Sequence, residues 1–152
     1  MSGLILRDAA KADLPAILAM LAEDVVPPGR EADPSDPRYL TAFEAIDADS
    51  NQRLIAAEVD GRVVGTMQLS FLPGLSFIGS WRGQIEAVRI AAGLRGQGLG
   101  EQMILWAVEQ CRARNCKLVQ LTTSATRTAA HRFYAGLGFV HSHVGMKLHS
   151  RD

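Results

Sequence analysis

A glycine-rich turn between a strand and a helix constrains this chain more than any other stretch of its sequence. Residues 95–100 read Arg-Gly-Gln-Gly-Leu-Gly, between the strand-like run 84–90 and an amphipathic helical pattern. Glycines at alternate positions remove Cβ atoms where a helix begins, so a ligand can approach the backbone closely. The first N–H groups of a helix have no acceptor within it, and the helix dipole is positive there. The turn therefore predicts a cradle for a phosphate group.

The composition is that of an ordinary globular chain. Its 152 residues fit one domain, residues 1–152, and 47% of them are apolar. The 16 basic and 16 acidic residues cancel, which argues against broad electrostatic binding to nucleic acid or to a membrane surface. No apolar run approaches the roughly 20 residues that span a bilayer. Cys111 and Cys116 form no C-x-x-C pair and are interpreted as reduced structural thiols, which favours a cytoplasmic protein.

Hydrophobic periodicity and turn signals divide the chain into alternating strands and helices. Strands are expected at 4–7, 53–59, 63–71, 84–90, 118–122 and 139–148, and helices from residue 12 or 13, at 39–48, at 99–114 and at 128–135. The sequence Asp60-Gly61-Arg62 predicts a hairpin turn. The proline-rich stretch 27–38 is a loop, either a surface connector or a lid over a substrate pocket. This order predicts an α/β (α+β) fold, with a mixed sheet and helices on both faces.

The spacing of the glycines distinguishes between phosphate-binding motifs. A dinucleotide motif, G-x-G-x-x-G, would place its third glycine at residue 101, which is Glu101. A mononucleotide P-loop would fit the spacing of Gly93 and Gly98, but Leu99-Gly100 follows where Lys and Ser or Thr are required. Both motifs are excluded, and the pattern that remains is Arg-x-x-Gly-x-Gly after a strand.

This pattern, at Arg95, Gly98 and Gly100, resembles the pyrophosphate-binding motif of the GNAT family of N-acetyltransferases, which holds the diphosphate of acetyl-CoA. A second block, 130–139 (AHRFYAGLGF), is similar to the family's A-x-x-F-Y-x-x-x-G-F block. One helix and one strand are expected between the blocks, as in the family. The resemblance covers nearly the whole chain in element order and residues 84–139 in motif detail. It implies a GNAT-like mixed, mostly antiparallel central sheet with helices on both faces.

The same resemblance implies that acetyl-CoA is the cosubstrate. It also implies that the acetyl group is transferred to the primary amine of a small molecule. One position departs from the family pattern. Many members carry Asn seven residues before the tyrosine of the second block, and here that residue is Arg127. The stretch 122–134 is more similar to the subgroup that contains the aminoalkylphosphonate N-acetyltransferases. Arg127 either faces the phosphates of the cofactor or is a solvated residue at a helix start.

Two residues are the candidates for acid–base chemistry. Glu86 interrupts an apolar strand, and burial there would raise its pKa. It is either a base, as the resemblance implies through a water molecule, or a structural partner of Arg82 or Arg89. Tyr134 lies in the Phe-Tyr block, and the resemblance implies that its hydroxyl is the acid that protonates the departing sulfur. The alternative for Tyr134 is a core aromatic residue.

The remaining candidates would bind the cofactor. In the family, the strand splays away from its neighbour near Val88, so the resemblance implies that Val88, Arg89 and Ile90 pair with the pantetheine arm like an added strand. The diphosphate would be held by main-chain N–H groups, with Arg95 as a charged partner and Phe133 as a packing residue. The residues of this cradle are Arg95, Gly96, Gln97, Gly98, Leu99, Gly100 and Glu101.

Other interpretations stay open at this point. His141 and His143 alternate on one strand face, but no third ligand has convincing spacing, so no metal site is predicted. His143 is a further hypothesis for a second base. Neither cysteine lies in a nucleophile motif, so transfer is expected to be direct. The alternatives are a protein or peptide N-acetyltransferase and a non-catalytic CoA-binding or sensing module. The resemblance also allows a homodimer.

The acceptor is not readable from the sequence. Arg53, Arg62, Arg82 and Arg89 are candidates for binding an acidic small molecule, such as an aminophosphonate or an amino acid. Scattered arginines are more often ordinary surface charge.

Overall fold

The five strands form one sheet in the order β1-β2-β3-β4-β5. The computed structural model describes residues 3–23 and 29–150. All neighbouring strands are antiparallel except β4 and β5, which are parallel. The mixed, mostly antiparallel sheet expected from the sequence is therefore confirmed. The strands are β1 (Ile5–Asp8), β2 (Gln52–Val59), β3 (Arg62–Leu72), β4 (Trp81–Ile90) and β5 (Cys116–Leu121).

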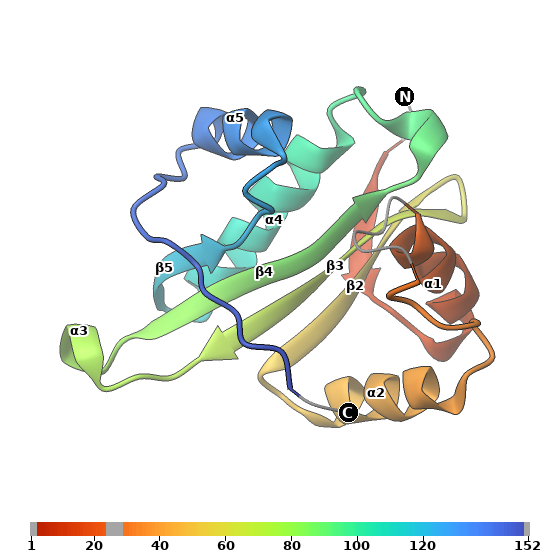
Figure 1. Ribbon diagram of the computed structural model, residues 1–152, viewed down its shortest axis with the longest axis horizontal. Coiled ribbons are helices and arrows are strands. Elements are labelled where there is room, and N and C mark those ends of the chain that lie inside the picture. The colour runs from red at the N-terminus through yellow and green to blue at the C-terminus, as the bar shows by residue number, and fades with distance from the viewer. Residues whose placement is uncertain (1–2, 24–28, 151–152) are drawn as a thin grey trace.

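Helices pack on both faces of this sheet (Figure 1). α1 (Leu14–Ala22) packs on one face, and α2 (Pro37–Ala48) follows it and lies beside β2. α4 (Leu99–Ala113) packs on the opposite face, and α5 (Thr128–Gly136) lies next to α4. Single turns occur at Lys11–Asp13, at α3 (Ser76–Gly79) and at Ala92–Leu94. Within the described ranges, every helix is too short or too polar to cross a bilayer.

Side-chain alternation along β2 separates two apolar layers. Ile55 faces α4 and belongs to a core that also contains Met67 and Met103, all fully buried. Ala56, the next residue, faces the other way and packs in a second cluster with Ile17 of α1. Each strand of this kind must bury both faces, which is why its central residues are apolar on both sides. The sheet is thereby packed between α1 on one face and α4 on the other.

Two features beyond the core test the sequence expectations. Asp60 and Gly61 have φ values of 52° and 77°, as a two-residue hairpin turn requires, so the predicted turn is confirmed. The strand predicted at 139–148 is wrong, because these residues pair with no other strand. Alternating apolar residues describe the faces of a strand, but a strand also needs a neighbour that bonds its backbone. Here Val144 and Met146 are 85% and 92% exposed.

Close packing of β4 against α4 gives a testable prediction. A methyl group at Gly83 would overlap the Sγ atom of Cys111, which is fully buried in the core. We expect Gly83→Ala to lower the free energy of unfolding by about 1–3 kcal/mol, because the core must shift to admit it. Gly145→Ala is the control, since a Cβ there meets no atom within 4 Å. Urea denaturation measures both, and equal stabilities for the two variants would contradict this packing.

Candidate active site

A bulge in β4 sets the direction of the side chains at the predicted site. Gln68 of β3 pairs with Glu86, and Thr66 pairs with Arg89, so β4 carries one extra residue between the two pairs. Ala87 lies in this extra length with a φ of 54°, in the left-handed region. Because Thr66 and Gln68 share one face of β3, Glu86 and Arg89 also share one face. A regular strand would place residues three apart on opposite faces.

The shared face is the one on which α1 packs. Ala56 belongs to the cluster around α1, and it pairs with Thr66 of β3. Directly paired residues point to the same side of a sheet, so Glu86 and Arg89 point to the α1 side. Val88 and Ile90 pack instead against the core that α4 covers. This part of β4 therefore presents charged side chains to the α1 side of the sheet and apolar side chains to the α4 side.

The outer edge of β4 opens at the same place. The parallel pairing of β4 with β5 ends at Ile85 and Leu121. Beyond this point, residues 86–90 of β4 pair with β3 only. After Leu121 the chain turns away toward α5 (Figure 1). The gap lies beside Val88, where the resemblance implies a splayed strand.

Main-chain groups point into this gap. The N–H of Ala91 donates to the carbonyl of Val64 on β3 at 2.8 Å. Since successive residues of a strand bond to opposite edges, Ile90 and Val88 direct their N–H and C=O groups away from β3. The carbonyl of Val88 is reached by a side chain, Nη1 of Arg89, at 2.9 Å. An extended amide ligand can therefore pair with this edge as an added strand would.

The glycine turn leads from β4 into α4. Gly96 and Gly98 have φ values of 80° and 81°, and a Cβ at either would meet no atom within 4 Å. Gly98 caps the helix, so the N–H groups that follow from Leu99 have no acceptor inside the helix. Arg95 pairs with Glu23 at the end of α1, at 3.4 Å. The turn is thus open, left-handed and rich in main-chain donors, and it fits a diphosphate.

Phe133 connects this turn to α5. A Cβ at Gly100 would lie 3.2 Å from Cδ1 of Ile90 and 3.5 Å from Cζ of Phe133. A side chain at Gly100 would therefore press on both β4 and α5. Phe133 is 38% exposed, and its ring lies 5.0 Å from that of Tyr134. It is a packing residue with one side open toward the turn.

Tyr134 reaches from α5 to the core beside the gap. Its ring makes edge-to-face contacts with Phe133 and, at 5.8 Å, with Phe139. Burial raises the pKa of Tyr134, and the positive charge of Arg89 opposes that shift. No hydrogen bond from the described part of the chain contributes to the shift. The phenol therefore keeps its proton at neutral pH.

Glu86 lies on the open face rather than in the core. It is exposed, so the burial that its apolar flanks suggested is not present. Its Oε1 accepts a long contact of 3.5 Å from Nε2 of Gln84, and Gln84 accepts in turn from Gln120 of β5 at 2.9 Å. Within the described ranges, Glu86 forms no ion pair with Arg82 or Arg89. The carboxylate is open to solvent and to a ligand.

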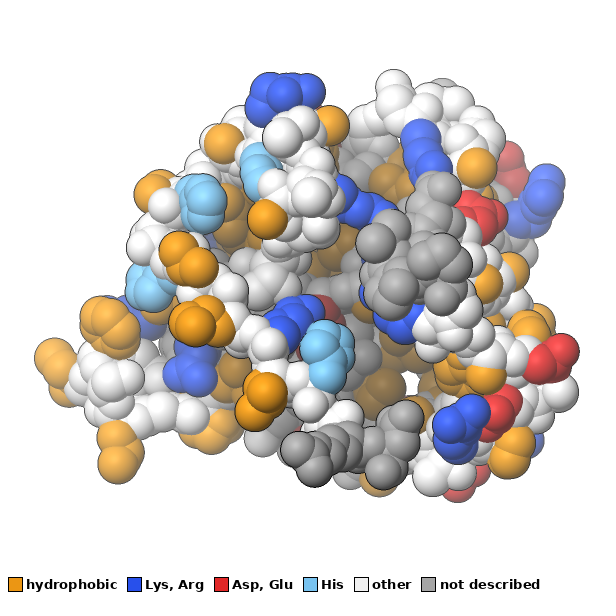
Figure 2. Space-filling model, viewed as in Figure 1, with side chains coloured by type: hydrophobic (Ala, Val, Ile, Leu, Met, Phe, Trp, Pro, Cys, Tyr) orange, Lys and Arg blue, Asp and Glu red, His pale blue; other side chains and the backbone are white. Residues whose placement is uncertain are grey.

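Arg89 shares its surroundings with two other arginines. Burial lowers the pKa of Arg89, and the positive charges of Arg127 and Arg30 lower it further, against a smaller opposing effect of Glu31. These residues come from β4, from the start of α5 and from the loop before α2. Figure 2 shows Lys and Arg side chains bordering a hollow in the middle of this face. Sequence reasoning missed Arg30, because the loop that carries it has no periodicity.

The other arginines considered as acceptor ligands lie elsewhere. Arg53 pairs with Asp8 at 2.8 Å and donates to Gln110 at 2.7 Å, so it joins β1 and α4 to β2. Arg62 is exposed at the hairpin turn, and Arg82 lies beside Gly74. Of these four arginines, Arg89 is the one whose pKa is lowered by Arg30 and Arg127.

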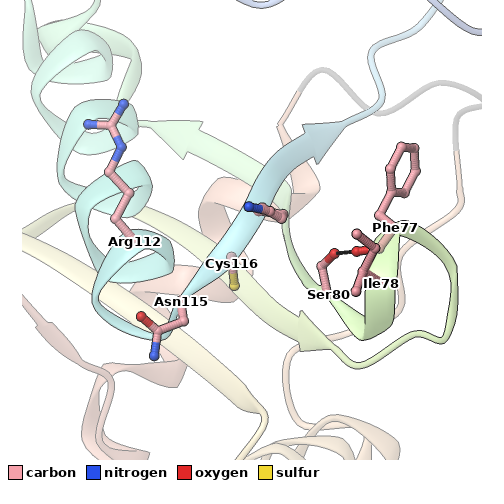
Figure 3. A pocket seen from close by; sticks show the side chains of 7 residues that line it. Phe77, Ile78, Ser80, Arg112, Asn115 and Cys116 are labelled. Carbon is pink, nitrogen blue, oxygen red and sulfur yellow. Dashed lines mark hydrogen bonds between the residues drawn. The ribbon is translucent and has the colours of Figure 1, made fainter.

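A separate hollow of about 560 Å³ lies at the other end of β4 (Figure 3). It contains none of the predicted site residues and has no carboxylate or imidazole, so it offers no acid–base pair. Its lining residues are Phe77, Ile78, Ser80, Arg112, Asn115, Cys116 and Lys117. The chemistry of β4 and α5, and not the size of a hollow, therefore locates the candidate site.

The two cysteines are free, and their environment suppresses their reactivity. Burial raises the pKa of the Cys111 thiol to about 11. Burial also raises the pKa of Cys116. A thiol that keeps its proton at neutral pH is a poor nucleophile. The interpretation of both as structural thiols is consistent with this geometry.

Two of the histidines lie near each other, since the ring centroids of His131 and His141 are 6.1 Å apart. In the part of the chain that the structure describes, no three His, Cys, Asp or Glu side chains gather where a metal ion could bind. Nε2 of His131 lies 2.8 Å from the carbonyl oxygen of Ser124. His143 is exposed in the segment after α5, and its Nδ1 lies 2.7 Å from Oγ of Ser142.

A comparison with protein-family models decides the family. Residues 18–139 match the model of the acetyltransferase (GNAT) family. The chain belongs to the GNAT family. It is an acyltransferase.

Similar proteins cover the chain almost completely. It is 32% identical over 138 residues to an aminoalkylphosphonate N-acetyltransferase of Salmonella typhimurium, covering 91% of this chain and 86% of that protein. A putative acetyltransferase from Agrobacterium tumefaciens has a TM-score of 0.85 at 27% identity, covering 96% and 99%. A Bacillus halodurans structure described as a transcriptional regulator has a TM-score of 0.93 at 43% identity, covering 97% and 100%.

The burial of Cys111 gives a second prediction. Because the pKa of Cys111 is about 11, only about 0.1% of its thiol is ionised at pH 8, and burial blocks access as well. We expect iodoacetamide at pH 8 to leave Cys111 unmodified in the folded protein and to modify it after unfolding, as measured by mass spectrometry. Cys116→Ala should leave acetyl transfer within twofold of the unmodified chain. Rapid alkylation of Cys111 in the folded protein would show that the thiol is accessible.

Proposed function

We propose that this acyltransferase moves the acetyl group of acetyl-CoA directly to the primary amine of a small molecule. The observation that carries the proposal is the conjunction on one strand of an open main-chain edge at Val88, an exposed carboxylate at Glu86 and a glycine cradle after Ile90. The Salmonella relative, whose name describes a small-molecule acetyltransferase, supports this acceptor class. A cytoplasmic location is part of the proposal, since both cysteines are free.

The donor would lie along β4. Its diphosphate would accept hydrogen bonds from main-chain N–H groups at the start of α4, where the left-handed glycines leave space. Its amide-bearing arm would pair with the groups of Val88 and Ile90 that face the gap. The donor supplies an activated thioester. Arg89 bonds to β3 through its backbone, so its part in the site falls to its side chain.

The chain's own residues would then move two protons. Glu86 would take a proton from the acceptor ammonium, through a water molecule, because its carboxylate is open to solvent. The N–H of Val88 would donate to the thioester oxygen as charge builds there. As the C–N bond forms and the C–S bond breaks, the hydroxyl of Tyr134 would give its proton to the departing sulfur. The raised pKa of Tyr134 keeps that proton in place until it is needed. The second proton lost by the nitrogen would pass through water to the phenolate and restore the phenol.

A regulatory module is the second candidate, because the Bacillus halodurans structure carries that description. A DNA-binding role would need a basic recognition surface. The chain has a formal net charge of zero, and α4 buries one side against the sheet. Incubation with acetyl-CoA and a panel of primary amines, with thiol release as the readout, separates the candidates. Binding of acetyl-CoA without any transfer would favour the regulator.

Substitution of the two proton-transfer groups gives a third prediction. We expect Glu86→Gln to lower kcat by roughly 10²–10⁴-fold at pH 7, because the amide cannot accept the proton. Tyr134→Phe should lower kcat with little change in KM for acetyl-CoA, because the ring contacts remain. Glu109→Gln, which changes an exposed carboxylate on α4 outside the candidate site, is the control for charge. If both substitutions leave transfer unchanged, this mechanism is wrong.

The glycine cradle gives a fourth prediction. A side chain at Gly98 would have to adopt a φ of 81° and would occupy the space above the turn. We expect Gly98→Ala to raise the KM for acetyl-CoA at least about tenfold, since a diphosphate contact to several N–H groups is lost. Gly61→Ala is the matched control, because Gly61 has a φ of 77° in a distant hairpin. Both variants should lose similar stability, and only the first should lose affinity for acetyl-CoA.

A further inference from the structure

A row of uncharged polar side chains crosses four strands of the sheet beside Glu86. Gln84 pairs with Ser70 of β3 and with Gln120 of β5. Ser70 pairs in turn with Gln52 of β2. Directly paired residues point to the same side of a sheet, so this polar row lies on the α1 side, as Glu86 does. Ser70 is buried and the three glutamines are half-buried, and polar groups at such positions are normally held by hydrogen bonds.

Hydrogen bonds divide the side chains of this region into two groups. On β2 and β3, Oε1 of Gln52 accepts from Nε2 of Gln68 at 3.0 Å. On β4 and β5, Nε2 of Gln120 donates to Oε1 of Gln84 at 2.9 Å, and Nε2 of Gln84 donates to Oε1 of Glu86 at 3.5 Å. Long contacts of this kind are common in active sites and shorten when the reacting groups are in place. The second group therefore ends on the proposed base.

The two contacts of Gln84 together fix the direction of its amide. An amide group has an acceptor at one end and a donor NH2 group at the other. The oxygen of Gln84 accepts from Gln120, so its NH2 group is the end that faces Glu86. In the reversed orientation, the amide oxygen would face a carboxylate oxygen, which is a repulsive contact. Gln120 therefore acts on Glu86 through Gln84.

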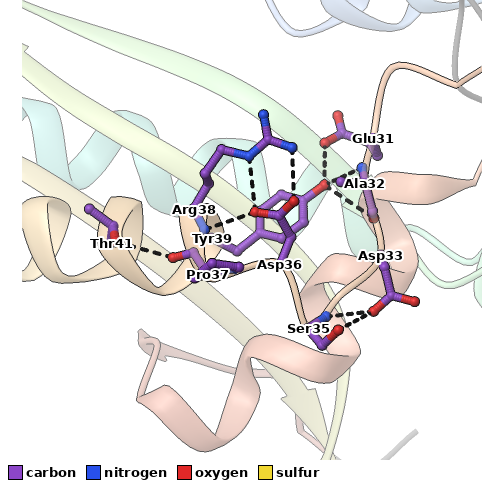
Figure 4. A network of polar contacts seen from close by, with 9 residues as sticks. All are labelled: Glu31, Ala32, Asp33, Ser35, Asp36, Pro37, Arg38, Tyr39 and Thr41. Carbon is purple, nitrogen blue, oxygen red and sulfur yellow. Dashed lines mark hydrogen bonds and ion pairs between the residues drawn. The ribbon is translucent and has the colours of Figure 1, made fainter.

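Carboxylates in another part of the chain are held differently. In the loop before α2, Asp36 forms an ion pair with Arg38 at 2.8 Å. Glu31 in the same loop accepts from the hydroxyl of Tyr39 at 2.9 Å, across only eight residues of sequence (Figure 4). These local contacts hold the loop to the helix that follows.

The bond between Gln120 and Gln84 spans 36 residues and joins two strands, and its groups are neutral. A guanidinium partner gives a carboxylate a full opposite charge, which competes with any proton that the carboxylate must accept. A neutral amide can hold a carboxylate in one orientation with a smaller effect on its charge. This arrangement suits a carboxylate that has to take up a proton.

We propose that Gln84 is a positioning residue for Glu86 and that Gln120 orients Gln84. The inference rests on the proposed function, in which Glu86 takes a proton from the acceptor ammonium through a water molecule. Gln84 occupies Oε1 of the carboxylate and leaves Oε2 to accept from that water. Gln84 itself neither gains nor loses a proton. The parallel pairing of β4 with β5 ends at Ile85, the next residue, so the paired strands hold Gln84 just before the edge of β4 opens.

Methionine substitutions test this inference, because methionine is similar in length to glutamine and lacks the amide. We expect Gln84→Met to lower kcat for acetyl transfer about three- to tenfold, as the loss of a hydrogen bond to a carboxylate allows. The KM for acetyl-CoA should change less than twofold, because the glycine cradle is untouched. Gln120→Met should lower kcat less. In the Gln84→Met variant, a second change Gln120→Met should have no further effect, because Gln120 acts through Gln84.

Gln52→Met is the matched control, because Gln52 belongs to the same polar row and its hydrogen bonds end on β3. It should leave kcat within twofold of that of the unmodified chain. Urea denaturation of each variant shows whether a loss of kcat reflects unfolding. If Gln84→Met does not fold, Gln120→Met on the edge strand carries the test against the same control. Equal losses of kcat in Gln52→Met and Gln84→Met, or additive losses in the double variant, would overturn the inference.

Glu86→Gln separates the failure of this inference from the failure of the proposed function. If Glu86→Gln lowers transfer while Gln84→Met and Gln120→Met leave it unchanged, the base is correct and its positioning by Gln84 is wrong. If Glu86→Gln leaves transfer unchanged, the proposed mechanism is wrong as well. In the Glu86→Gln variant, Gln84→Met should lower kcat no further, because no base remains to be positioned. A further loss there would give Gln84 a separate role and would contradict the inference.

Discussion

The bulge at Ala87 is the local feature on which the arrangement of the active site depends. It adds one residue to β4 against β3 and so turns Glu86 and Arg89 to the same face. Two residues earlier, β5 stops pairing, and the edge of β4 becomes free. A left-handed alanine is unfavourable by about 1–2 kcal/mol, and strands that are paired on both edges rarely tolerate a bulge of this kind. The bulge is therefore tolerated because β5 no longer pairs with this part of β4.

Periodicity explains why the core could be expected from the sequence. Leu99, Met103 and Cys111 recur at helical spacing, and all are buried on the face of α4 that meets the sheet. Periodicity also explains why the prediction of a strand at 139–148 was wrong. Its residues alternate as in a strand, yet pairing depends on a free edge elsewhere in the chain, and no pattern within the segment reports that. Predictions that depend on local chemistry, such as the turn at Asp60-Gly61, were therefore more reliable than predictions that depend on pairing between strands.

The candidate site likewise contains features that local sequence motifs predict and features that depend on distant parts of the chain. The glycine cradle and the Phe-Tyr block are local motifs, and the sequence indicated both. The electrostatic interaction of Arg89 with Arg30 and Arg127 is not local, because it joins a strand to a loop and to a helix start. Spacing could not join them, and Glu86 was expected to be buried because its neighbours along the strand are apolar. The bulge reverses the ordinary alternation at that point, so a pattern that assumes a regular strand assigns Glu86 the wrong surroundings.

A net charge of zero excludes a broadly basic surface, but it does not exclude a small site for an anion. The main-chain N–H groups at the start of α4 carry no formal charge, so they do not appear in any count of basic residues. If the diphosphate of the donor lies at this turn, as proposed, the open edge of β4 at Val88 leads from it toward Glu86 along the same strand. The two ends of one strand segment would then serve the binding of the donor and the removal of a proton.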